Sequence, residues 1–471
     1  MVRGEFYGYP WTQWAVFLVC YGVFFFFGGI EASESIYYSL MKTELEIPYK
    51  VQGWLVSMGS YSFIIGSPIV GYLMTLTDVK PILVIAFLCY LAAYVMLYNF
   101  KNLWVVFISL FIEGLGGVML DVGMNTLSTV IFVLHRGVMM NSLHFFYGLG
   151  SAVGPTYSSF VYSLLHRGYK GIFLGLMIPA GLGFMFTLIT RLSLNRSEQE
   201  LKAVLSEKDA QGAKEQASLS EHPTQKKEQS KDELTIWKAF ITPMVWLLGL
   251  SMGAVYAIES VTVNWAPLYL KEMFDMNPEE EGTRFVSLFF VYYTAARLLI
   301  GFIVDWLGDT KSMLLFNVLL IGLYVVGFGL KRNGVWILAF SGFLISPFYP
   351  TSITVPMEVF GKEAKNSISV ILCLALIVNA LIQVIIGYVN EYLGPQWGYP
   401  LMSLAMCLVM ILCMIITQWW LKRRSCDCVS KVDNQAISDS QVVVTVDVSG
   451  TEAQANTTPS LKVAQSNTVT I

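Results

Sequence analysis

The amino-acid sequence predicts an all-α membrane protein with twelve transmembrane helices in two pseudo-symmetric six-helix halves. The first observation behind this prediction is composition. Of 471 residues, 55% are hydrophobic and only 13% are charged, whereas typical soluble domains carry about 25% charged residues. The second is a succession of apolar runs, each near the roughly 20 residues that a helix needs to cross a bilayer. The third is that the pattern of the first half of the chain returns in the second.

This composition excludes a soluble enzyme, a nucleic-acid binder and a disulfide scaffold. The formal net charge is −3, and the chain has no basic block suited to a phosphate backbone. Most of the seven cysteines lie inside apolar runs, and none stands at metal-ligand spacing from a histidine. We therefore expect reduced cysteines, no bound metal and no cofactor.

The predicted elements are apolar segments taken in chain order. They lie at approximately 13–36, 53–75, 81–99, 103–130, 139–165, 170–191, 236–269, 285–306, 312–330, 335–358, 366–390 and 398–421. Two long polar stretches interrupt the series. The predicted organisation is therefore a cytoplasmic N-terminus (1–12), an N-terminal six-helix half (13–191), a cytoplasmic linker (192–235), a C-terminal six-helix half (236–422) and a disordered cytoplasmic tail (423–471).

Orientation follows from the positive charges. Twelve spans place both termini on the same side, and with that side cytoplasmic the inner segments hold most of the 30 Lys and Arg residues. We read the first apolar run as a retained helix. The plasma membrane is the default location, and an endomembrane remains open.

Cys426 and Cys428 follow a basic cluster at the membrane edge, a setting that favours palmitoylation, although two unmodified thiols are an equal alternative.

Ionisable residues inside the spans are functional candidates, because such groups are costly in lipid unless they are paired or hydrated. They are Glu31, Glu34, Glu113, Asp121, His144, Glu259 and Arg297, with Asp305 and Glu358 at the cytoplasmic margins. Asp121 and Asn125 share one helix face. Together they could bind a hydroxyl-rich solute, take up a proton, or form a buried structural pair. His144 could relay protons or sit buried and hydrogen-bonded.

Three later spans add polar and aromatic candidates. Span 7 contains Tyr256, Glu259, Asn264 and Trp265, a combination that suits a sugar, although Trp265 could instead anchor the interface. Span 10 carries three prolines around Tyr349, which predicts a broken, cavity-facing helix. In span 11, Asn379 and Gln383 share a face and could contact substrate or join helices. The glycines of Gly148-x-Gly150-x-x-x-Gly154 predict close helix packing.

Two cytoplasmic motifs carry a family resemblance. Gly301-Phe-Ile-Val-Asp305-Trp-Leu-Gly308-Asp-Thr-Lys311, with Arg297 four residues earlier, resembles the loop motif of major facilitator transporters. Pro356-x-Glu358-x-x-Gly361 resembles another gate motif of that superfamily. The resemblance implies gating roles for Arg297, Gly301, Asp305, Gly308, Lys311 and Glu358. In the first half the motif is degenerate, with Thr75 at the aspartate position.

Within the superfamily, the chain resembles the fucose/glucose symporter-like group, including its fungal and sodium-dependent glucose transporter-like eukaryotic branches. Asp121 and Asn125 resemble an acid–asparagine pair of the bacterial members, and Ser346 to Thr351 resembles their Ser-x-x-aromatic-Pro-Thr stretch. Leu143 to Ser151 resembles a stretch of the eukaryotic members, as do Tyr256, Glu259 and Trp265. The first-helix carboxylate of the bacterial members falls nearer Ser35 than Glu31 or Glu34.

The leading hypothesis is a secondary active transporter, not an enzyme, that works by alternating access. It would carry a sugar or similar small polar solute across the lipid bilayer with proton or sodium coupling, and it would bind no nucleic acid. Glu31, Asp121 and Glu259 would take part in coupling. One alternative is a nutrient sensor or scaffold on a transporter fold, supported by the long linker and tail. Another is a carrier of an organic anion or peptide that binds Arg297.

Overall fold

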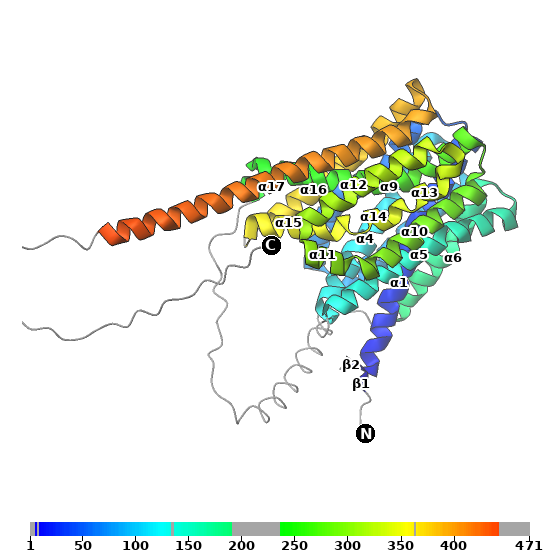
Figure 1. Cartoon of the computed structure of the whole chain (residues 1–471). Helices are drawn as coiled ribbons and strands as arrows, with labels where there is room; N and C mark the ends of the chain where they lie inside the picture. Colours follow the sequence, from blue (N-terminus) through cyan, green and yellow to red (C-terminus); the bar gives the residue numbers. More distant parts are fainter. Residues whose placement is uncertain (1–4, 7–8, 133–135, 191–235, 362–363, 442–471) are drawn as a thin grey trace, which may run out of the picture. The chain divides into compact units, whose positions relative to one another are not determined.

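The computed structural model describes residues 5–6, 9–132, 136–190, 236–361 and 364–441 (Figure 1). The predicted linker and residues 442–471 lie outside these ranges. Two short strands near the N-terminus, β1 (Glu5–Phe6) and β2 (Tyr9–Pro10), pair antiparallel. All other elements are helical, so the predicted all-α class is confirmed for the described residues.

The N-terminal half consists of six long helices. They are α1 (Trp11–Glu44), α2 (Tyr49–Leu76), α3 (Val79–Asn99), α4 (Leu103–Ile131), α5 (Arg136–Leu165) and α6 (Tyr169–Ile189). Short polar side chains begin two of them. The Asp78 carboxylate accepts from Val79 N at 2.7 Å, and the Asn102 side-chain oxygen accepts from Trp104 N at 2.9 Å. These caps satisfy backbone donors that a helix start leaves without partners.

The C-terminal half is more interrupted. It contains α8 (Ile236–Ile241), α9 (Pro243–Phe274), the π-helix η1 (Pro278–Gly282), α10 (Thr283–Leu299), α11 (Gly301–Leu307), α12 (Asp309–Gly329), the 3₁₀-helix η2 (Lys331–Gly334), α13 (Val335–Ala339), α14 (Ser341–Ile345), α15 (Phe348–Phe360), α16 (Ala364–Tyr392) and α17 (Pro395–Gln441). The predicted break in span 10 is present, because α15 begins directly after Pro347.

Membrane-spanning character extends through both halves. Ten helical segments within the described residues are long and apolar enough to cross a membrane. The 30-residue α5 and the consecutive α10 and α11 complete the twelve predicted segments. Large apolar side chains such as Trp306 and Phe302 are 83% and 79% exposed, as expected for surfaces that contact lipid. The protein is therefore an integral, multi-pass membrane protein.

The two halves form one compact unit through Trp419. Between them, α2 packs along α16, α5 along α10, and α1 against α9. Figure 1 shows α5 and α10 running side by side. Within the first half, α1 meets α5 at glycines, as predicted. A Cβ atom added to Gly154 would lie only 2.0 Å from the Gly29 carbonyl oxygen, and one on Gly150 only 1.9 Å from that of Phe25. Only glycine permits this backbone approach.

The halves are tied together at one end of the bundle, which we call the joined end and which comprises residues 42–49, 271–272 and Glu391. There Lys42 pairs with Glu272 at 3.9 Å and lies 3.9 Å from the centre of the Tyr49 ring. The Tyr49 backbone N–H donates to Glu391 at 2.8 Å, and Lys271 donates to Thr43 at 3.0 Å. Each of these contacts, apart from Lys42 over Tyr49, links one half to the other.

One predicted region differs in the structure. Residues 423–441 continue α17 as helix, whereas the sequence predicts a disordered tail from 423 onward. That stretch contains no proline or glycine to stop the helix. Residues 420–471 form a second unit, of which the structure describes only the helical part up to Gln441. The side chains of Cys426 and Cys428 lie outside the described part, so the palmitoylation hypothesis stays a prediction.

Candidate functional site

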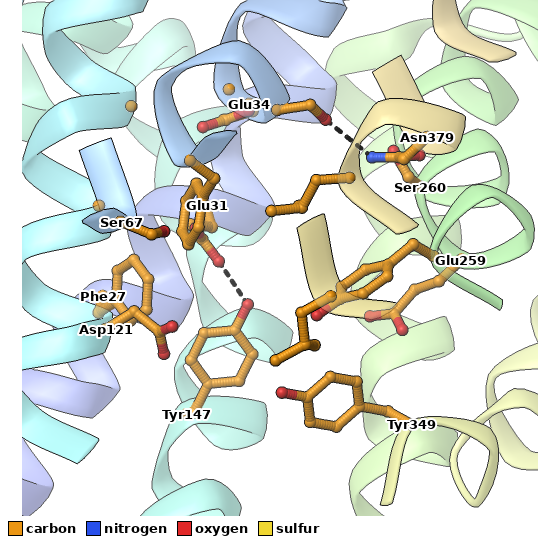
Figure 2. Close-up of a pocket in the computed structure, with 18 of the residues that line it drawn as sticks. Phe27, Glu31, Glu34, Ser67, Asp121, Tyr147, Glu259, Ser260, Tyr349 and Asn379 are labelled. Carbon is orange, nitrogen blue, oxygen red and sulfur yellow. Dashed lines mark hydrogen bonds between the residues drawn. The ribbon is translucent and has the colours of Figure 1, made fainter. Parts of the chain in front are cut away.

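A cavity of about 960 Å³ lies between the two halves. Its walls come mainly from α1, α2, α4 and α5 on one side and from α9, α10, α15 and α16 on the other. Cavities of roughly 300–1,000 Å³ that combine aromatic walls with a few polar groups are typical ligand sites. Figure 2 shows side chains of both halves facing each other across this space.

Two carboxylates of the N-terminal half face the cavity. Glu31 on α1 accepts a hydrogen bond from the Tyr147 hydroxyl of α5 at 2.5 Å. Asp121 on α4 accepts one from the Asn125 amide at 2.8 Å, one helical turn later on the same face. In Figure 2 the Glu31 and Asp121 side chains lie near Phe27 and Tyr147. Each donor holds one oxygen of its carboxylate in place.

Glu113 forms a deeper acidic group in the same half. It is only 2% exposed, and its two oxygens accept from the hydroxyls of Tyr37 and Tyr94, both at 3.0 Å. Glu34, one turn after Glu31 on α1, also lines the cavity and interacts electrostatically with Glu113. Buried carboxylates normally find hydrogen-bond donors, and for Glu113 the two tyrosines supply them.

The C-terminal half contributes a carboxylate together with a guanidinium. Glu259 on α9 accepts from the Tyr293 hydroxyl of α10 at 3.2 Å, and Arg297 donates to that same hydroxyl at 3.0 Å. The Arg297 guanidinium carbon lies 4.7 Å from the centre of the Tyr293 ring. Arg297 also donates, at 3.5 Å, to the backbone carbonyl of His144 in the other half.

Arg297, to which the motif gives a gating role, lines the cavity, and its gating role stays a prediction. Arg297 reaches the cavity because it lies one helical turn after Tyr293, on the same face of α10. Gly308, which ends α11, has φ +81°, a conformation that favours glycine. Lys311 and Glu358 are exposed. The side chain of Asp305 and the surroundings of Gly301 lie outside the described part, so the gating roles of both residues stay predictions.

An amide network joins α9, α16 and α2. Trp265 donates to the Gln383 side-chain oxygen at 2.7 Å, and Gln383 donates to Ser260 at 2.8 Å. Asn379 donates to Ser60 across the halves at 3.0 Å, as the dashed line in Figure 2 shows. Two of these residues lie away from the cavity, and Gln383 joins helices, one of the two roles that the sequence left open for it. Trp265 and Gln383 are 1% and 0% exposed and lie outside the cavity lining, because each satisfies the other's polar group.

The other predicted contact residues all line the cavity. They are Glu31, Glu34, Asp121, Asn125, His144, Tyr256, Glu259, Asn264, Tyr349 and Asn379. The sequence did not single out several other lining residues. They include Phe27, Ser60, Ser67, Tyr90, Ser260 and Tyr293. Tyr293 had a usable signal, since it precedes Arg297 by four residues. Ser60 and Ser67 had none, because small hydroxyl residues occur throughout membrane helices.

Comparison with known proteins fits this geometry. A family model described as Major Facilitator Superfamily matches residues 16–372, most of the chain. The chain belongs to the major facilitator superfamily. No curated protein matches the sequence.

Solved structures of major facilitator proteins share its fold. A D-xylose–proton symporter has a TM-score of 0.62 at 15% identity over 84% of this chain and 97% of that one. The inward-open xylose transporter XylE of E. coli has a TM-score of 0.63 at 14% identity over 84% and 95%. A nucleoside transporter, NupG, has a TM-score of 0.66 at 13% identity over 86% and 99%. These likenesses establish the fold.

Proposed function

We propose that this major facilitator protein is a secondary active transporter that carries a sugar or a similar small polar solute through the central cavity. The observation that carries the proposal is the cavity between the two halves, in which carboxylates, amides and aromatic rings face one another. Aromatic faces suit the C–H surface of a sugar ring, and the polar groups suit its hydroxyls. The sugar and nucleoside transporters that share the fold support this reading.

Ion coupling is the second part of the proposal. Glu31, Asp121 and Glu259 face the cavity from three helices, and burial disfavours the charged form of a carboxyl group. Such a group can bind a proton or a sodium ion in one state and release it in the other. With one ion bound per cycle, an ion gradient would drive accumulation of the solute.

The direction of access follows from the joined end. If both termini are cytoplasmic, the joined end faces outward, and the structure corresponds to a state whose outer end is held together by Lys42, Glu272, Thr43, Lys271, Tyr49 and Glu391. Access would then alternate as these contacts break and contacts at the opposite end form. We assign Gly301, Asp305, Gly308, Lys311 and Glu358 to that opposite gate from their motifs.

One observation favours a second candidate, a carrier of organic anions or peptides. Arg297 lines the cavity, where a guanidinium could bind a carboxylate. Against it, Arg297 already donates to Tyr293 beside Glu259, and carboxylates outnumber it in the lining. We therefore place the neutral or basic solute first.

Uptake into proteoliposomes tests the proposal. Purified protein is reconstituted and given labelled sugars, nucleosides, peptides and organic anions, with and without pH or sodium gradients. We expect one polar, hydroxylated class to accumulate only when a gradient is imposed. Ser67→Trp, which places an indole into the cavity, should abolish that uptake while the protein stays monodisperse in detergent. Specific solute binding without any uptake would instead favour the sensor alternative.

A further inference from the structure

The charge balance of the cavity is strongly acidic. Its lining holds five carboxylates, those of Glu31, Glu34, Glu113, Asp121 and Glu259. Among the lining residues that the structure describes, Arg297 is the sole lysine or arginine, and it is engaged by Tyr293 in the C-terminal half. No described lysine or arginine lies within 4.0 Å of any of these carboxylates. The acidic excess therefore falls mainly on the N-terminal wall.

Two of these carboxylates have an oxygen left to bind a solute. Asp121 accepts its hydrogen bond at Oδ1, from Asn125, and Glu31 accepts its hydrogen bond at Oε2, from Tyr147. No donor from the described residues reaches Asp121 Oδ2 or Glu31 Oε1. Both side chains lie on the same side of the cavity, next to Phe27 and Tyr147 (Figure 2). An ammonium group has three N–H donors and no acceptor, so it complements two carboxylate oxygens that lack donors.

Aromatic rings surround the same place. Phe27 and Tyr147 lie beside Asp121 in Figure 2, and Tyr349 lines the cavity from the other half. Tyr256 packs edge-on against Tyr349 with ring centres 5.7 Å apart. The faces of such rings attract cations and do not attract anions. Carboxylates with open oxygens and aromatic rings around them make an environment for a positively charged group.

We propose that the transported solute carries a protonated amine in addition to its hydroxyl groups, and that Asp121 and Glu31 form its ammonium subsite. This inference rests on the proposed function and specifies its substrate class. A neutral sugar would leave the acidic excess of this wall uncompensated, and an anionic sugar would increase it, whereas an amino sugar reduces the repulsion between Asp121 and Glu31. Arg297 does not compensate them, because its guanidinium lies beside Tyr293 and Glu259.

Four sugars that share the same pyranose ring test the inference: one is cationic, two are neutral and one is anionic. D-Glucosamine, D-glucose, N-acetyl-D-glucosamine and D-glucuronate are titrated against the purified protein, at a pH at which the amine is protonated. Binding is followed by the rise in melting temperature, and uptake is followed with labelled glucosamine and glucose. We expect glucosamine to bind about tenfold more tightly than glucose or the N-acetyl sugar, the gain typical of one hydrogen bond to a charged group. Glucuronate should bind most weakly.

Variants of the two carboxylates test whether the amine binds at Asp121 and Glu31. Asp121→Asn keeps the size of the side chain and its contact with Asn125, and it should bring glucosamine binding down to the level of glucose. Glu31→Gln should do the same in part. Asp275→Asn is the matched control, because Asp275 is exposed in the loop after α9 and loses the same charge. It should keep the tenfold preference.

Three results would overturn the inference. Equal binding of glucosamine and glucose by the wild type would show that protons or sodium ions alone neutralise the wall, and the proposed sugar transport would still stand. A preference that persists in Asp121→Asn and Glu31→Gln would place the amine elsewhere. Binding of none of the four sugars by well-folded protein would overturn both the inference and the sugar assignment.

Discussion

At the scale of single residues, three of the cavity carboxylates are each held by one donor from their own half. Tyr147 donates to Glu31, Asn125 to Asp121, and Tyr293 to Glu259. Each donor occupies one oxygen and fixes the direction of the group, so the carboxylates face the cavity with little freedom to turn away. Their negative charge is compensated by nearby arginine only around Glu259.

The first prediction concerns coupling by these carboxylates. Asp121→Asn and Glu259→Gln each remove a group that can bind and release a cation, so gradient-driven accumulation should fall until the inner and outer solute concentrations are about equal. Exchange of solute down its own gradient should continue. The measurement is uptake of labelled solute into proteoliposomes with an imposed pH or sodium gradient.

The control for this prediction is again Asp275→Asn, which should accumulate solute like the wild type. A structural role would look different: both variants would lose the monodisperse detergent peak. Wild-type accumulation by both well-folded variants would exclude a coupling role for Asp121 and Glu259.

At the scale of helices, glycine contacts and polar contacts place the elements that build the cavity. Gly28, Gly150 and Gly154 bring α1 and α5 together, which sets Glu31 within reach of Tyr147. Between the halves, Gly53 on α2 faces Gly387 on α16, where an added Cβ would lie 3.2 Å from the Gly387 Cα atom. Close backbone approach of this kind needs small residues.

The second prediction tests the contact between α1 and α5. Gly154→Ala should lower the melting temperature by several degrees, because its Cβ would lie 2.0 Å from the Gly29 carbonyl oxygen and overpacking costs about 1–3 kcal/mol. Gly181→Ala on α6 is the matched control, since nothing lies within 4 Å of an added Cβ there. Both changes gain helix propensity equally. Equal melting temperatures for the two variants would contradict the packing.

The third prediction tests the joined end. Lys42→Gln removes the ion pair with Glu272 and the contact with Tyr49. This pair is partly exposed, and a pair near the surface contributes up to about 1 kcal/mol. The population with a separated joined end should therefore rise about two- to fivefold. The reporter is native Cys373, which is exposed in the cavity. Its labelling by a membrane-impermeant maleimide from the joined side, measured by peptide mass spectrometry, should increase.

Lys101→Gln provides the matched control for this change. Lys101 is exposed in the loop between α3 and α4 and loses the same charge without leaving an ion pair broken. Its Cys373 labelling should equal that of the wild type. Labelling that stays unchanged in Lys42→Gln would show that Lys42 does not hold the two halves together.

At the scale of the whole molecule, twelve segments and two halves create the cavity. Residues through Trp419 form a single compact unit, and the cavity is lined by helices of both halves. The contacts of the joined end lie where α1 and α9 finish and where α2 begins. This arrangement suits a rocking motion of the halves around a central solute.

The fourth prediction concerns topology. An even number of spans places both termini on one side of the membrane, and the positive-inside rule makes that side cytoplasmic. Epitope tags at either terminus should bind antibody only in permeabilised cells. A tag inserted after Asp275, in the loop between α9 and η1, should bind antibody in intact cells. A terminal tag that binds antibody in intact cells would contradict the orientation.

The sequence by itself determined the class of fold and the approximate position of every span. A helix in lipid must satisfy its own backbone hydrogen bonds and present about 20 apolar residues, and both requirements are visible in a linear chain. It also singled out Glu31, Asp121 and Glu259, because charged residues in apolar runs are conspicuous. The break in span 10 was predictable for a similar reason, since proline disrupts helices locally.

Only the tertiary structure decided which polar side chains share the cavity. Trp265 and Tyr256 lie on the same helix, yet Trp265 donates a hydrogen bond to Gln383 outside the cavity lining, while Tyr256 lines the cavity. Arg297 belongs to a gate motif in sequence but lies beside Tyr293 and Glu259 in space. These outcomes depend on contacts between helices that are far apart in the chain. Helical periodicity determines on which face of its own helix a residue lies, but it does not determine which other helix packs against that face.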